Sequence, residues 1–82
     1  AIRGTTIRFD LPGPQPTGVE LVVYNLTGQV VRQLITGTRL PGPYEITWDG
    51  KNEAGQRVPS GTYWYRLKAG NRVASKRLTI LR

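Results

Sequence analysis

The chain has 82 residues and a formal net charge of +7, from twelve Lys and Arg residues against five Asp and Glu residues. This length fits one small domain. The absence of cysteine excludes a disulfide framework and a thiolate metal site, and the absence of histidine removes the commonest general base and the commonest zinc ligand. We therefore expect neither catalysis nor a cofactor.

The positive charge favours anionic partners such as nucleic acid, acidic glycans or lipopolysaccharide. A solvated surface that keeps a small domain soluble is the alternative explanation, because the basic residues are spread along the chain. No apolar run approaches the roughly 18 residues that span a bilayer, so no transmembrane segment is expected. The chain begins with Ala rather than Met. This favours a piece of a larger protein, with a linker remnant at residues 1–4 and one domain at residues 5–82.

The first predicted strand covers residues 5–11, where Ile7, Phe9 and Leu11 alternate with polar residues. A strict period of two predicts a strand with one buried face and one face in water. Residues 12–18 contain three prolines and fit neither a helix nor a central strand. We interpret them as a stiff connector between two sheets. A proline-rich ligand for an aromatic groove is the functional alternative.

A hairpin is predicted next, from strands at residues 19–25 and 29–35. Residues 25–28, Asn-Leu-Thr-Gly, form its turn and place Gly28 where a positive φ is needed. Residues 36–43 contain two glycines and two prolines, which predicts a loop, with a short edge pairing as the alternative.

Residues 44–67 are the stretch around which we expect the other strands to arrange themselves. Large apolar side chains alternate with polar ones at residues 44–48 and again at residues 62–69. The segment between them carries three turn signals, and we predict that it joins the two strands into a hairpin. A tight Gly70-Asn71 turn then leads to a last strand at residues 72–81.

Short strands separated by turn signals predict an all-β fold, an immunoglobulin-like antiparallel β-sandwich of about seven strands. No helical spacing and no internal repeat are apparent. The expected core consists of the inward-facing apolar residues Ile7, Phe9, Leu21, Val23, Tyr44, Ile46, Trp48, Tyr63, Tyr65 and Leu67.

Two blocks carry a family resemblance: V-x-L-V-V-Y-N-L-T-G-Q-V-V-R-Q-L at residues 19–34 and I-T-W-D-G-K-N-E-A-G-Q-R-V-P-S-G-T-Y-W-Y-R-L at residues 46–67. They resemble the type A C-terminal sorting domain of proteins exported by the type IX secretion system. They are also similar to a related family, the immunoglobulin-like domain of the flagellar hook-capping protein. The basic and apolar ending at residues 75–82 favours the sorting domain. Asn25 stands where that family usually has aspartate.

The sorting resemblance implies a non-catalytic domain that directs a larger secreted protein, often a hydrolase, to the cell surface. The implied partners are the type IX secretion machinery, anionic surface lipopolysaccharide and N-terminal cargo domains of the same chain. The implied location runs from the periplasm to the outer-membrane surface or the extracellular space. Residues matching the export motif are Lys76, Arg77, Leu78, Thr79, Ile80 and Leu81, with Gly28, Gly61 and Tyr63. Adjacent cations on a terminal strand also guard a sheet edge against aggregation.

Two other functions stay open. Trp64, Arg66 and Lys68 share the outward face of one predicted strand, where they would stack sugar rings or bases. This predicts a carbohydrate-binding or accessory module of a secreted enzyme, although Trp64 would also serve simply to cover an open sheet. The flagellar resemblance implies instead a structural domain of a hook-capping scaffold.

Asp49, Asn52 and Glu53 offer oxygen ligands for a metal ion, but Lys51 occupies one ligand position of a calcium loop. We expect the Asp49 carboxylate to accept backbone N–H groups of its own turn instead. Catalysis by paired carboxylates would draw on Asp10, Glu20, Glu45, Asp49 and Glu53. No apolar pocket that would hold one of them protonated is evident, so we predict neither a metal site nor catalysis.

Overall fold

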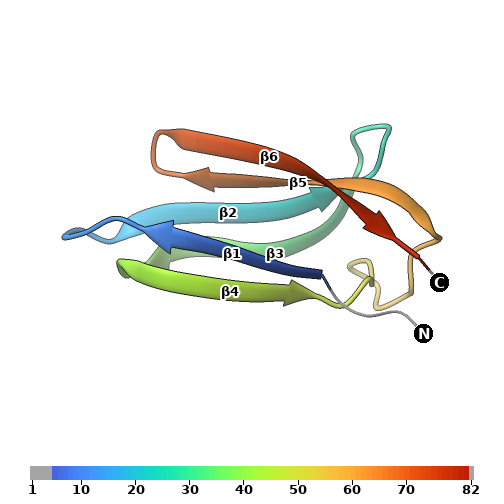
Figure 1. Ribbon diagram of the computed structural model, residues 1–82, viewed down its shortest axis with the longest axis horizontal. Coiled ribbons are helices and arrows are strands. Elements are labelled where there is room, and N and C mark those ends of the chain that lie inside the picture. The colour runs from blue at the N-terminus through green and yellow to red at the C-terminus, as the bar shows by residue number, and fades with distance from the viewer. Residues whose placement is uncertain (1–4, 82) are drawn as a thin grey trace.

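Six strands form two antiparallel sheets in the computed structural model, which describes residues 5–81 (Figure 1). The strands are β1 (Thr5–Leu11), β2 (Thr17–Tyr24), β3 (Val30–Arg39), β4 (Gly42–Trp48), β5 (Gly61–Ala69) and β6 (Arg72–Ile80). One sheet has the order β1–β4 and the other the order β3–β2–β5–β6. The predicted antiparallel sandwich is confirmed, with six strands rather than about seven. The predicted linker at residues 1–4 lies outside the described residues.

The small sheet follows directly from the alternating pattern of β1. Ile7 and Leu11 point inward and are buried, while Arg8 and Asp10 are exposed. Phe9 lies opposite Tyr44 of β4, and their rings stack with centroids 5.4 Å apart. The proline-rich connector then carries the chain from this sheet to β2 of the other sheet, as predicted.

The predicted loop at residues 36–43 is wrong, and strand pairing there is more extensive than the short edge pairing that was the alternative. β3 continues to Arg39, which lies opposite Thr17 of β2, and β4 already begins at Gly42, which lies opposite Leu11. The glycines and prolines suggested a loop because they lack strand-forming side chains. Pairing is made by backbone groups, however, so a neighbouring strand can hold such residues in a ladder.

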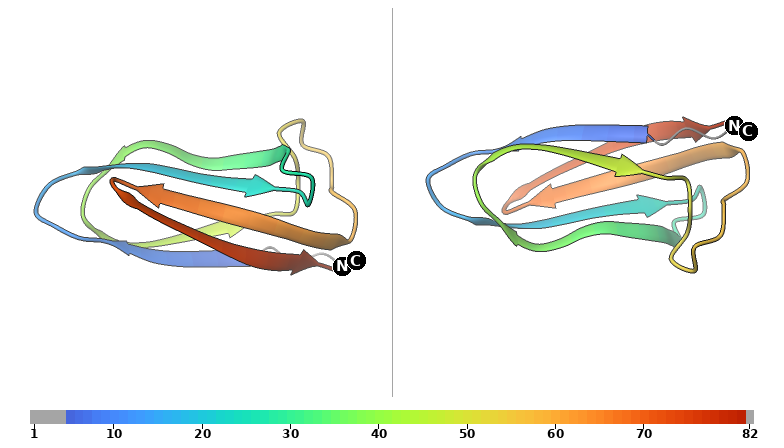
Figure 2. Two further views of the ribbon diagram at one scale, coloured as in Figure 1. Left: turned by 90° about the horizontal axis from the view of Figure 1, so that it is seen from above. Right: turned by 90° about the horizontal axis from the view of Figure 1, so that it is seen from below.

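The predicted hairpin between residues 44–48 and 62–69 is also wrong. β4 pairs with β1, whereas β5 lies between β2 and β6 in the other sheet. The segment at residues 49–60 crosses from one sheet to the other at one end of the sandwich (Figure 2). Alternation reveals that a segment is a strand, but it does not identify the partner strand.

Two clusters of buried side chains fill the space between the sheets. Trp48 is fully buried, and its ring meets Tyr63 edge to face with centroids 5.6 Å apart. The rest of this cluster is Val23, Val58, Leu78 and Ile80, and the second cluster is Ile7, Leu11, Val19, Leu21 and Ile35. Five predicted core residues, Phe9, Tyr44, Ile46, Tyr65 and Leu67, are only partly buried, although all five pack against these clusters. Among residues 5–81 there is no helix that could span a membrane.

Candidate functional site

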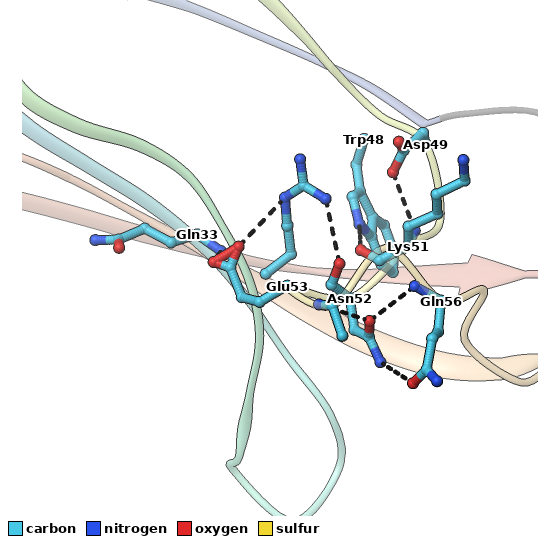
Figure 3. A network of polar contacts seen from close by, with 9 residues as sticks. Gln33, Trp48, Asp49, Lys51, Asn52, Glu53 and Gln56 are labelled. Atoms are coloured by element: carbon cyan, nitrogen blue, oxygen red, sulfur yellow. Dashed lines mark hydrogen bonds and ion pairs between the residues drawn. The ribbon is translucent and has the colours of Figure 1, made fainter.

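The loop at residues 49–60, which contains the candidate metal ligands, is closed by its own hydrogen bonds (Figure 3). Asp49 Oδ1 accepts the backbone N–H of Lys51 at 3.0 Å, as predicted for a carboxylate at such a turn. The indole N–H of Trp48 donates to the carbonyl of Lys51 at 2.9 Å. The loop is therefore anchored to the core through the tryptophan that ends β4.

Glu53 ties this loop to β3. One carboxylate oxygen lies 3.5 Å from Nε of Arg32, and the other accepts the backbone N–H of Gln33 at 3.4 Å. The backbone N–H of Glu53 donates to the carbonyl of Val31 at 3.1 Å. Glu53 therefore links the loop at residues 49–60 to β3. In the described part of the chain, no group of three or more His, Cys, Asp or Glu residues could hold a metal ion.

The carboxylates lie at the surface. Glu45 forms an ion pair with Arg8 at 2.9 Å, and Asp10 and Glu20 are exposed. No charged or polar side chain is buried among residues 5–81. All five carboxylates, Asp49 and Glu53 included, are therefore in contact with solvent.

The predicted export motif forms part of β6, an edge strand of the four-stranded sheet. Lys76 lies opposite Tyr65 and Arg77 opposite Trp64, so the two cations point to opposite faces, as predicted. Both are exposed, as are Thr79 and Leu81. Leu78 and Ile80 are buried in the cluster around Trp48. Two of the three apolar residues of the motif therefore belong to the core, and Leu81 does not.

The three remaining residues of the motif lie in two different parts of the fold, the β2–β3 turn and strand β5. Gly28 has a φ of 85° in the turn between β2 and β3, as predicted. Gly61 begins β5 opposite Ile80, and Tyr63 lies opposite Leu78. The Tyr63 hydroxyl donates to the carbonyl of Pro59 at 2.7 Å. The fold therefore brings Gly61 and Tyr63 beside the terminal strand and leaves Gly28 in a separate turn.

Aromatic and basic side chains gather on the outer side of the four-stranded sheet. Trp64, Arg66 and Lys68 are exposed along β5, with Tyr24 of β2 opposite Trp64. Arg77 of β6 places its guanidinium carbon 5.2 Å from the centroid of the Trp64 ring. We call these five residues the aromatic–basic face.

Sequence reasoning placed only three residues on this face and missed Arg77. The signal was available, because the Gly70-Asn71 turn pairs Ala69 with Arg72 and so brings Arg77 opposite Trp64. The role predicted for Trp64, Arg66 and Lys68, stacking on sugar rings or bases, stays a prediction.

Comparison with known proteins identifies the family. The model of the FlgD Ig-like domain matches residues 3–75. The chain belongs to the FlgD Ig-like domain family. It is similar to the basal-body rod modification protein FlgD of Salmonella typhimurium (strain LT2) and of Salmonella typhi, with 37% identity to each over 68 residues. These residues are 82% of this chain and 29% of each relative, so the chain spans less than a third of these FlgD proteins.

The FlgD assignment overturns the type IX interpretation. The sorting function is wrong, and so are the type IX machinery and lipopolysaccharide as partners and the location at the outer-membrane surface or outside the cell. The resemblance to the sorting domain was misleading because the residues that carry it have structural roles. The first block forms most of β2, the β2–β3 turn and the first half of β3. The second forms the end of β4, the loop between the sheets and most of β5, and Leu78 and Ile80 of the ending belong to the core. These residues therefore build the fold of the domain and do not by themselves identify an export address.

Proposed function

We propose that this chain is a non-catalytic structural module of a FlgD-type protein that acts in assembly of the flagellar basal-body rod. The family match over residues 3–75 carries the proposal. The similarity to two basal-body rod modification proteins supports the rod as the structure on which the whole protein acts.

The geometry suits a rigid module. The described chain measures 41 × 24 × 21 Å, and the anchored 49–60 loop links the sheets at one end. Its two outer sheet faces are open for contact with neighbouring subunits. A structural role also agrees with the residue types, because the chain lacks cysteine and histidine and keeps its carboxylates at the surface.

The test is made in the organism that encodes this chain. Deletion of the codons for residues 5–81 is expected to abolish or strongly reduce flagella, counted by electron microscopy, and to stop swimming. An immunoblot of the remaining protein checks that it is still produced. Normal flagella in the deletion strain would overturn the proposal.

Two point variants sharpen this test. Leu78→Ala removes a buried side chain from β6, whereas Leu81→Ala removes a side chain that is 77% exposed. If the folded module is what assembly needs, Leu78→Ala reduces the number of flagella and Leu81→Ala leaves it unchanged. The same number of flagella in both strains would argue against a role for the folded domain.

A further inference from the structure

The two outer faces of the sandwich differ in how their charges are paired. On the β1–β4 sheet, Arg8 pairs with Glu45 at 2.9 Å, and the hydroxyls of Thr6 and Thr47 are hydrogen-bonded at 3.2 Å. The charges of this face are therefore satisfied largely within the face itself.

The aromatic–basic face has cations without such partners. The ion pairs within residues 5–81 are Arg8–Glu45 and Arg32–Glu53, so Arg66, Lys68 and Arg77 form none there. Glu20 lies opposite Lys68 in the strand register but makes no ion pair with it. Three cations close together on β5 and β6 thus form no ion pair within the described chain, which favours a negatively charged partner.

One end of this face is apolar. A shallow hollow of about 350 Å³ is lined by Tyr24, Leu26, Trp64, Arg66 and Ser75 among others. Leu26 is 68% exposed, and Val30, which lies opposite Tyr24, is 58% exposed. Exposed apolar side chains beside arginines are the usual composition of the centre of a protein–protein contact.

The position of Arg77 argues against sugar or base stacking. Its guanidinium lies over the Trp64 ring and covers a face on which a sugar or base would stack. A guanidinium stacked on an aromatic ring keeps the N–H donors at its edge, and these donors match a carboxylate in geometry. Trp64 therefore serves as a platform for the arginine.

We propose that the aromatic–basic face binds an extended acidic protein segment, with one apolar side chain of that segment in the hollow. Arg66 and Lys68 are two residues apart on β5, which places them on the same face at the strand repeat. An extended chain with carboxylates at alternate positions has the same repeat, so its carboxylates would lie along these cations. Arg77 contributes a third contact from β6.

This inference goes beyond the flagellar role and does not depend on it, because binding is measured on the purified 82-residue chain. The probe is a short synthetic peptide in which Glu alternates with Ser and a Leu stands at each end. Matched peptides carry Gln for Glu, or Ser for Leu. A single-stranded oligonucleotide and heparin represent other polyanions. Titration calorimetry gives the affinities, and a change in tryptophan fluorescence reports contact with the face, since Trp64 is exposed whereas Trp48, the other tryptophan, is fully buried.

The expected result is binding of the Glu and Leu peptide that Arg66→Glu weakens by about tenfold or more. Arg57→Glu is the matched control, since it makes the same charge change at an exposed loop position outside the face, and it should stay within about twofold of the parent chain. Lys68→Glu is the second variant on the face. Circular dichroism checks that all variants are folded.

The hollow has its own test. Leu26→Ser should weaken binding of the peptide with Leu ends and leave binding of the peptide with Ser ends unchanged. Equal losses in Arg66→Glu and Arg57→Glu would show that net charge alone drives binding and would overturn the proposal. Equally tight binding of the oligonucleotide or heparin, with the same dependence on Arg66, would identify a general polyanion surface instead. Failure of the Glu and Leu peptide to bind would also overturn it.

Discussion

Asn25 and Asn52 close two separate turns with the same set of hydrogen bonds. In each turn the side-chain oxygen accepts the backbone N–H groups two and four residues further on, at 3.0–3.1 Å. In each, the backbone N–H of the asparagine donates to the carbonyl four residues further on, at 3.0 Å and 2.8 Å. The sequence Asn-x-x-Gly-Gln occurs at residues 25–29 and 52–56. The chain therefore contains a short sequence repeat, although no internal repeat was predicted.

Replacement of either asparagine should destabilise the fold. Asn25→Ala and Asn52→Ala each leave backbone N–H groups without their acceptor, so each should lower the free energy of unfolding by about 1–2 kcal/mol. Urea denaturation followed by tryptophan fluorescence measures this. Leu26→Ser, in the same turn as Asn25, is the control and should change stability by no more than about 0.5 kcal/mol. An equal loss in the control would contradict the role of the asparagine bonds.

The turn glycines allow a test of backbone conformation alone. Gly28 and Gly55 have φ values of 85° and 81°, and a Cβ added at either would meet nothing within 4 Å. Gly28→Ala and Gly55→Ala should therefore cost about 1 kcal/mol each through φ strain. Gly18→Ala also meets nothing within 4 Å, but at a position without a positive φ. Thermal unfolding should show Gly18→Ala to be neutral or stabilising; a similar loss at all three positions would exclude φ as the cause.

The terminal strand should be required for stability. Leu78 is 7% exposed within the cluster around Trp48, so Leu78→Ala should lower the free energy of unfolding by about 2–5 kcal/mol. Leu81→Ala should have almost no effect. A chain that ends at Ala74 lacks both Leu78 and Ile80 and is expected to lose cooperative unfolding in circular dichroism. Retention of a native spectrum and a sharp transition by the truncated chain would contradict this account of the core.

The shorter of the two ion pairs should contribute less to the free energy of unfolding than the longer one. Arg8–Glu45 is the shorter, at 2.9 Å, but its side chains are 72% and 61% exposed. Glu45→Ala should therefore cost no more than about 0.5 kcal/mol. Glu53→Ala also removes the acceptor of the Gln33 N–H and should cost about 1 kcal/mol.

Urea denaturation at low and high salt checks this ranking, because salt screens an exposed pair more than a backbone hydrogen bond. A larger loss for Glu45→Ala than for Glu53→Ala at both salt concentrations would show that distance outweighs exposure here.

The candidate surface could be predicted in part. The alternation along β5 placed Trp64, Arg66 and Lys68 together, since the residues of one strand share a face by local geometry. Tyr24 and Arg77 joined them through strand pairing. That the Arg77 guanidinium lies over the Trp64 ring, and that Leu26 borders the hollow, depends on side-chain packing between segments distant in sequence.

Local structure followed from the residues themselves. The bounds of β1, the positive φ of Gly28 and the Gly70-Asn71 turn depend on neighbouring residues, so the local pattern was enough to predict them. The partner of β4, the continuation of β3 and the burial of Val58 depend on contacts between residues far apart along the chain. Several ways of pairing the strands agree with the same alternating pattern. These pairings differ in stability because they differ in how completely the two sheets bury their side chains against each other. The extent of this burial is determined only by the complete tertiary structure.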